Sequence, residues 1–293
     1  MSMPPSQLQS LDMERMRSWI GRAESSSDTI VPRPIAALSA TLDRMDPLPQ
    51  EGDLLPPLWS WLYFLPLHRM SELAEDGHAK RGGFLPPVPL PRRMFAGGRF
   101  TFSQPLRVGD RVERTSRIVD VTEKQGKTGQ LVFVRVKHTI TKAGVTAVEE
   151  EQDIVYRGAK QAGEIGPAPQ PSPSAAAWRR EIHPQAVLLF RYSALTFNGH
   201  RIHYDRSFTS QSEGYPGLIV HGPLIATLLA DLLRRNLPSA TVDMFSFRSI
   251  RPIFDTALFT ISGRFHESEN RVELWASDAE GWLAMEATAI VHT

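Results

Sequence analysis

The sequence has 293 residues, of which 41% are hydrophobic and 22% charged, a composition typical of a globular protein that can bury a core. With 33 basic and 32 acidic residues, the net charge of +1 gives no general attraction to nucleic acid or to a membrane surface. Because cysteine is absent, disulfides, thiolate nucleophiles and cysteine-ligated metals are excluded.

The N-terminus lacks the apolar core of a signal peptide. The most apolar stretch, residues 55–67, contains three prolines and is too short to span a bilayer. We therefore expect a cytoplasmic protein with no membrane contact.

The first half shows short helical patterns followed by strands. Residues 13–22 predict a short amphipathic helix, 35–42 a second one, and 55–67 a proline-broken segment that packs as a helix or lid. From Arg99 onward the pattern changes to consecutive strands separated by short turns. Such strands predict an antiparallel sheet.

Residues 159–177 are rich in Pro, Ala, Gly and Ser and have no apolar period, so they predict an extended linker. The linker divides the chain into an N-terminal half, residues 1–158, and a C-terminal half, residues 178–293.

The second half begins with a helical pattern over residues 185–197 and an irregular polar stretch over 198–213. Gly222 and Pro223 then open an apolar helix that ends in Arg234 and Arg235, so we expect a helix buried on most sides. Strands are predicted over four further segments, residues 243–250, 257–265, 271–278 and 282–291.

The two halves share one order of elements. Residues 100–110 (FTFSQPLRVGD) match residues 245–255 (FSFRSIRPIFD), and three long strands follow each segment. We predict an α+β fold of the double hotdog type, with two antiparallel sheets that each wrap a central helix. Edge-to-edge pairing of the two sheets would cover their exposed strand edges.

Four of the nine histidines fall between residues 183 and 221: His183, His200, His203 and His221. The stretch NGHRIHYD, residues 198–205, places polar groups in a loop beside an apolar helix, which indicates a pocket. This stretch and YPGLIVHGP, residues 215–223, resemble the MaoC-like family of R-specific enoyl-thioester hydratases over about residues 186–291.

The wider pattern, including PLPRRMFAGG at residues 89–98, is similar to one branch of that family. The branch contains itaconyl-CoA and mesaconyl-C4-CoA hydratases and the mitochondrial 3-hydroxyacyl-thioester dehydratase. The resemblance implies an acyl-CoA substrate and no cofactor other than the coenzyme A that the substrate carries. Asn198 stands where the family motif has Asp, although this branch tends to have Asn.

Addition of water across an α,β double bond needs a base, an acid and donors for the thioester oxygen. Asn198 has no useful pKa and can only hold the water, whereas His203 can deprotonate the water and return the proton to Cα. The Gly222 N–H at the helix start is placed to bind the oxyanion. Thr227, which matches a Ser of the family, is expected to orient Asn198.

The other polar residues allow several interpretations. His200 and His221 are expected to be structural or to line the pocket, with His221 counted among the substrate-binding residues. A zinc site of His200, His203 and either His221 or Asp205 is the alternative, although we expect no metal. The pairs Arg92–Arg93 and Arg234–Arg235 are expected on solvated faces, with coenzyme A phosphates as the alternative partner.

The first half lacks an equivalent of Asn198 and His203, so we predict one active site per chain, with that half as the wall of the acyl tunnel. A dicarboxylic substrate requires a cation, for which Arg201 is the first candidate, followed by Arg248 and Arg251. Arg201 paired with Asp205 is the alternative. A long-chain substrate would instead need an apolar tunnel, which three aromatic residues are available to line: Trp59, Trp61 and Phe64.

The function predicted from these features is hydration of an unsaturated acyl thioester, itaconyl-CoA or mesaconyl-C4-CoA. The alternatives are a 3-hydroxyacyl-thioester dehydratase of fatty-acid synthesis, an acyl-CoA thioesterase, which Asn198 disfavours, and a non-catalytic thioester-binding subunit. A homodimer or higher homo-oligomer is expected.

Overall fold

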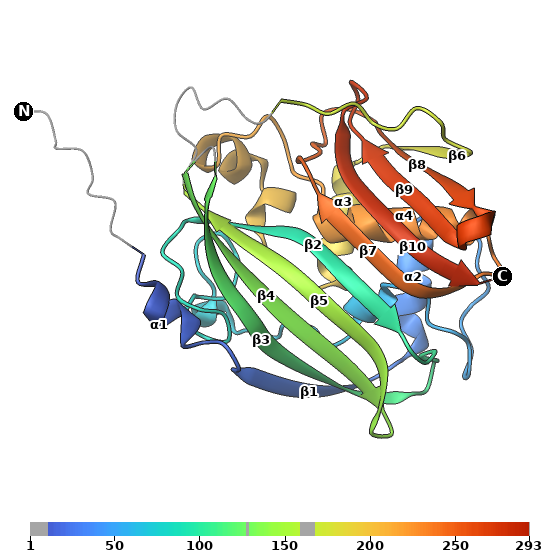
Figure 1. Ribbon diagram of the computed structural model, residues 1–293, viewed down its shortest axis with the longest axis horizontal. Helices are drawn as coiled ribbons and strands as arrows, with labels where there is room; N and C mark the ends of the chain where they lie inside the picture. The colour runs from blue at the N-terminus through green and yellow to red at the C-terminus, as the bar shows by residue number, and fades with distance from the viewer. Residues whose placement is uncertain (1–10, 127–128, 159–167, 293) are drawn as a thin grey trace, which may run out of the picture.

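The computed structural model describes residues 11–126, 129–158 and 168–292. Its strands form one ten-stranded antiparallel sheet in the order β1-β3-β4-β5-β2-β7-β10-β9-β8-β6 (Figure 1). The elements of the first half are α1 (Met13–Arg17), β1 (Ala23–Thr29), α2 (Pro32–Thr41), β2 (Arg92–Phe102), β3 (Arg111–Gly126), β4 (Gly129–Lys142) and β5 (Val145–Arg157). Those of the second half are β6 (Trp178–Ile182), α3 (Ala186–Leu195), α4 (Gly222–Asn236), β7 (Thr241–Ser249), β8 (Phe259–His266), β9 (Arg271–Ser277) and β10 (Leu283–His292).

The strand order is the same in both halves when each is followed from its outer edge to the join between β2 and β7. The first half gives β1-β3-β4-β5-β2, and the second gives β6-β8-β9-β10-β7. Phe100 lies directly opposite Phe245 across the join, and these are the first residues of the two matching sequence segments. The predicted double hotdog arrangement is confirmed.

The join between the halves is short. β2 pairs with β7 only from Gly97 to Thr101, where a Cβ on Gly97 would lie 2.5 Å from the Phe247 carbonyl oxygen. Glycine is therefore needed for the close approach of the two strands. Before Gly97, β2 continues along β5 but no longer pairs with β7.

The core centres on α4, whose residues from Leu224 to Leu233 are all buried. In the first half the helix α2 is only ten residues long. The segment of residues 55–67 fills the remaining core volume with the buried side chains of Leu58, Trp59, Leu62 and Tyr63. Its only helical part is the 3₁₀ turn Trp59–Leu62, so the predicted helix or lid is wrong. Its prolines prevent a longer helix.

Several predicted boundaries need correction. α1 ends at Arg17 rather than at residue 22. β1 and β6, the outer strands of the sheet, were not predicted; β1 has the sequence AESSSDT, which shows no apolar alternation. Of the predicted linker, residues 159–167 lie outside the described residues, and β6 begins at Trp178, where the linker was expected to end. In the described part of the chain, no helix is long and apolar enough to cross a membrane.

Candidate active site

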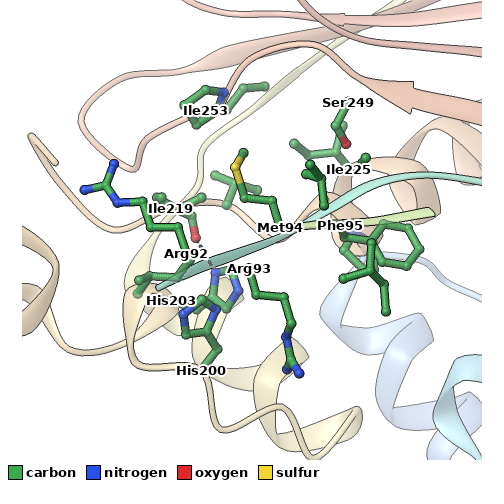
Figure 2. Close-up of a pocket in the computed structure, with 18 of the residues that line it drawn as sticks. Arg92, Arg93, Met94, Phe95, His200, His203, Ile219, Ile225, Ser249 and Ile253 are labelled. Carbon is green, nitrogen blue, oxygen red and sulfur yellow. Dashed lines mark hydrogen bonds between the residues drawn. The ribbon is translucent and has the colours of Figure 1, made fainter. Parts of the chain in front are cut away.

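A cavity of about 450 Å³ lies where β2 and β7 part. It is bordered by the first residues of β2, the start of α4, the segment that follows β7 and the loop after α3 (Figure 2). Asn198, His203 and Gly222 all line it, so the structure brings together three of the four predicted catalytic residues.

His203 ends the 3₁₀ turn Arg201–His203 and is only 7% exposed. Its Nδ1 lies 2.7 Å from the Ile219 carbonyl oxygen, so Nδ1 carries the proton and Nε2 keeps its lone pair. Burial lowers the pKa of His203 to about 4, although the bond to Ile219 opposes this. At neutral pH the ring is therefore uncharged, and its Nε2 can accept a proton as a base.

Asn198 follows α3 after Phe197, whose φ of 50° turns the chain away from the helix axis. Its Oδ1 accepts a hydrogen bond of 3.0 Å from the His200 backbone N–H. With the oxygen occupied, the amide NH₂ remains as a donor. Asn198 is thus suited to hold a water by that water's oxygen.

The four rings of His78, His200, His203 and His221 form a continuous series. Ring centroids are 3.9 Å apart for His78 and His200, 5.4 Å for His200 and His203, and 3.6 Å for the stacked His203 and His221. His221 is fully buried and its Nε2 lies 2.8 Å from the Ser193 hydroxyl. It is not among the residues that line the cavity, so it supports His203 from behind rather than binding substrate.

The first half contributes polar side chains to this cavity as well. Asp76 accepts bonds of 3.0 Å from both the backbone N–H and the Nδ1 of His78, and both residues line the cavity. Gly77, between them, adopts a φ of +86°, and a Cβ there would lie 1.9 Å from the Gly199 oxygen. The loop therefore packs backbone to backbone against the Asn198 motif, and the first half is more than the predicted wall.

Two donors lie at the start of α4. The Gly222 N–H belongs to the first turn, whose N–H groups have no acceptor within the helix. The Ser249 hydroxyl at the end of β7 is buried and has no hydrogen-bond partner among the described residues. It lies 3.6 Å from where a Cβ on Gly222 would stand, and both residues line the cavity. Sequence reasoning missed Ser249 because an isolated serine at a strand end carries no motif.

Thr227 does not orient Asn198. Its hydroxyl donates to the Pro223 carbonyl oxygen at 2.8 Å and lies 3.4 Å from the Tyr192 hydroxyl, inside the core behind the cavity. Thr227 is not among the α4 residues that line the cavity, which are Gly222, Pro223 and Ile225.

The three arginines expected to bind substrate have different positions. Arg201 is outside the cavity lining: its guanidinium donates to Asp205 and to the Glu75 carbonyl oxygen, so the alternative interpretation is correct. Arg248 is largely exposed and pairs with Glu286, also outside the lining. Arg251 does line the cavity, with Asp278 at 3.6 Å.

Of the two arginine pairs expected on solvated faces, only Arg235 is exposed, and three of the four arginines make ion pairs. The Arg92 side chain is only 10% exposed and bonds to Glu213, while its neighbour Arg93 lines the cavity. Arg234 and Arg235 pair with Asp46 and Asp231. The aromatic residues considered for an acyl tunnel, Trp59, Trp61 and Phe64, pack in or against the core rather than around this cavity.

The histidines do not form the zinc set that the sequence left open, since Asp205 is bound to Arg201 and His221 to Ser193. A different group, Asp76, His78 and His200, has potential ligand atoms within 4.8 Å of one another. Both Asp76 oxygens already accept hydrogen bonds from His78, which leaves this group few free ligand atoms.

Comparison with known proteins agrees with this geometry. The model of the family "Hydroxyacyl-thioester dehydratase type 2" matches residues 58–255. The chain is 47% identical over 274 residues to the mesaconyl-C(4)-CoA hydratase of Chloroflexus aurantiacus, covering 92% of this chain and 96% of that one. It is 25% identical over 257 residues to the mitochondrial hydroxyacyl-thioester dehydratase type 2 of Schizosaccharomyces pombe, covering 78% of this chain and 85% of the other.

The fold is also found among solved structures. A structure described as a MaoC-like dehydratase superposes with a TM-score of 0.68 at 14% identity, covering 94% of this chain and 98% of that one. The resemblance stated from the sequence is confirmed. The chain therefore belongs to the hydroxyacyl-thioester dehydratase type 2 family of hydro-lyases and has a MaoC-like fold.

Proposed function

We propose that the protein adds water across the double bond of a dicarboxylic enoyl-CoA, with mesaconyl-C4-CoA as the substrate and itaconyl-CoA as the alternative. The observation that carries the reaction type is the pairing of a neutral, tautomer-fixed His203 with the amide donor of Asn198 in one buried cavity. The similarity to the Chloroflexus hydratase over nearly the whole chain supports the choice of substrate.

In the proposed mechanism, the Asn198 amide donates to the oxygen of the attacking water, and that water donates a proton to Nε2 of His203. The water oxygen bonds to Cβ while the π electrons move onto Cα and the thioester oxygen. His203 then returns its proton to Cα, so the net change is addition of one water. The Gly222 N–H and the Ser249 hydroxyl donate to the thioester oxygen, where negative charge develops.

The same groups catalyse the reverse reaction, because hydration and dehydration share one transition state. Dehydration of a 3-hydroxyacyl thioester in fatty-acid synthesis is therefore the second candidate, favoured by the family description and the Schizosaccharomyces relative.

A thioesterase fits the cavity less well. The carboxylates that line it are Asp76 and Glu213, which are bound to His78 and Arg92. Neither is free to act as the base that thioester hydrolysis usually requires.

We further propose that no metal or separate cofactor takes part, because His203 and Asn198 can activate the water, no electrons are transferred, and coenzyme A arrives with the substrate. Cytoplasmic location and a homodimer or higher oligomer remain predictions; light scattering on the purified protein measures the oligomeric state.

Incubation with mesaconyl-C4-, itaconyl-, crotonyl- and saturated acyl-CoA tests the function. Loss of enoyl absorbance without release of free thiol, highest for mesaconyl-C4-CoA, is the expected result. Release of free thiol would instead assign a thioesterase, and binding without turnover a non-catalytic subunit. Higher activity on 3-hydroxyacyl thioesters than on the dicarboxylic substrates would favour the dehydratase.

A further inference from the structure

We propose that Arg93 binds the free carboxylate of the acyl group and so selects dicarboxylic substrates. The inference rests on the proposed function and replaces the predicted role of Arg201, which lies outside the cavity lining.

The chemistry of the substrate fixes where such a cation must lie. In mesaconyl-C4-CoA the carbon β to the thioester carries both a methyl group and the free carboxylate. Water attacks this same carbon, so the carboxylate lies one bond from the site of attack. Its partner must therefore be close to His203 and Asn198, not at the far end of the cavity.

Arg93 meets this condition. It projects from the start of β2, where that strand has parted from β7. It lines the same cavity as His203 and Asn198, and Figure 2 shows its side chain running past the His200 ring. Its positive charge is one of the causes, after burial, that lower the pKa of His78 to about 4. The same charge, after burial and neighbouring histidines, contributes to the lowered pKa of His200.

Among the described residues, Arg93 has no ion-pair partner, although Asp76 belongs to the same electrostatic surroundings. No Asp or Glu oxygen lies within 4.0 Å of its guanidinium among the residues that the structure describes. Its neighbour Tyr156 is a neutral phenol, since burial raises the pKa of that side chain. The other two arginines of the cavity lining each have a carboxylate partner. Arg92 is bound to Glu213, whereas Arg251 lies 3.6 Å from Asp278 and makes no hydrogen bond through that nitrogen.

An unpaired guanidinium at the edge of a buried cavity favours an anionic ligand, because a carboxylate can accept two parallel hydrogen bonds from it. An apolar group at the same position would take water away from the half-buried cation and supply no carboxylate in its place. Arg93 therefore both attracts the dicarboxylic substrate and disfavours its apolar analogue.

The test compares mesaconyl-C4-CoA with 3-methylcrotonyl-CoA, in which a methyl group replaces the carboxylate and nothing else changes. We expect Arg93→Met to lower kcat/KM for mesaconyl-C4-CoA by about a hundredfold or more. The value for 3-methylcrotonyl-CoA should stay unchanged or rise, and Arg93→Lys should retain an intermediate preference. Thermal unfolding of each variant checks its fold. The ratio of the kcat/KM values for the two substrates does not depend on what fraction of the protein is active.

Arg201→Met and Arg251→Met are the matched controls. Arg201 ties the Asp76 loop to the catalytic motif, so its loss should affect both substrates alike. An equal loss on both substrates with Arg93→Met, or a selective loss with Arg251→Met instead, would overturn the assignment to Arg93. So would a preference for mesaconyl-C4-CoA that a chelator abolishes, because the carboxylate would then bind a metal at Asp76, His78 and His200. A wild-type protein that turns over only the methyl analogue would contradict the proposed substrate itself.

Discussion

The Nδ1 of His203 lies 2.7 Å from the carbonyl oxygen of Ile219, a residue two positions before the N-cap of α4. This bond couples the catalytic ring to the strand-like segment that leads into the central helix. The ring orientation, the tautomer and the position of the Gly222 N–H therefore depend on one short piece of backbone. A mechanism with a single proton-transferring group requires this kind of fixed geometry.

Replacement of His203 by Ala should lower kcat by about a hundredfold or more, the usual effect of losing a general acid–base group. His203→Gln, which retains a donor to Ile219 but cannot accept and return a proton, should be nearly as inactive. The hydration rate with saturating mesaconyl-C4-CoA measures both effects. A Gln variant with more than a tenth of the wild-type rate would remove His203 from proton transfer.

The pH dependence of kcat/KM should show an acid limb near pH 4. Burial lowers the pKa of His203 to about 4, and the base must be unprotonated to accept a proton from water. Activity should therefore be constant from pH 8 to about pH 5.5 and fall tenfold per pH unit only below pH 4. An acid limb near pH 6.5 would mean that the ring is solvated in the working enzyme.

Asn198 tests how the water is held. Asn198→Ala removes the amide donor as well as the acceptor for the His200 N–H, so we expect a loss of at least about tenfold in kcat. Asn198→Asp retains the acceptor and adds a negative charge near His203. This variant should keep measurable turnover with an acid limb shifted to higher pH, because the charge favours the protonated ring. Unchanged activity in the Ala variant would contradict the water-holding role.

Most of the correct sequence predictions came from the internal repeat and from the family motif. The match between the segments that begin at Phe100 and Phe245 predicted two halves with the same order of elements. These two residues face each other across the join. The strands with β-branched alternation were placed within a few residues. β1 was missed because its stability comes from pairing with β3, whereas its own sequence, AESSSDT, has no apolar face.

The candidate site could be predicted only where a motif spans it. Asn198, His203 and Gly222 lie within 25 residues of one another in the chain, so their spacing is visible in the sequence. Asp76 and His78 reach the cavity from more than 100 residues away, through the contact between Gly77 and Gly199. Arg93 is equally distant in sequence and reaches the cavity from β2. Long-range contacts of this kind leave no periodic signal. Arg201 was favoured for its place between two histidines, but a 3₁₀ turn directs it towards Asp205.

Ser249→Ala should lower kcat by about tenfold or more for every thioester substrate, because the hydroxyl is proposed to bind the developing oxyanion. Ser249→Thr, which keeps a hydroxyl, should retain most of the activity. KM should change little, since the interaction strengthens in the transition state. The matched control is Ser246→Ala, an exposed serine on the same strand that does not line the cavity. Full activity of the Ser249→Ala variant would mean that the Gly222 N–H alone binds the oxyanion.

The buried histidines predict acid sensitivity well above the pH at which carboxylates are protonated. Burial lowers the pKa of His78 and of His203 to about 4, whereas an unfolded histidine titrates near 6.5. The unfolded chain therefore binds more protons between these two values, and the stability present above pH 6.5 is lost as the pH falls towards 4. Each group contributes a slope of up to about 1.4 kcal/mol per pH unit in this window.

Urea unfolding at pH 7, 6 and 5 should show a steadily falling midpoint. His203→Gln should reduce the dependence by about one proton. A midpoint in the wild type that stays constant down to pH 5 would show that these rings are not buried in the folded protein.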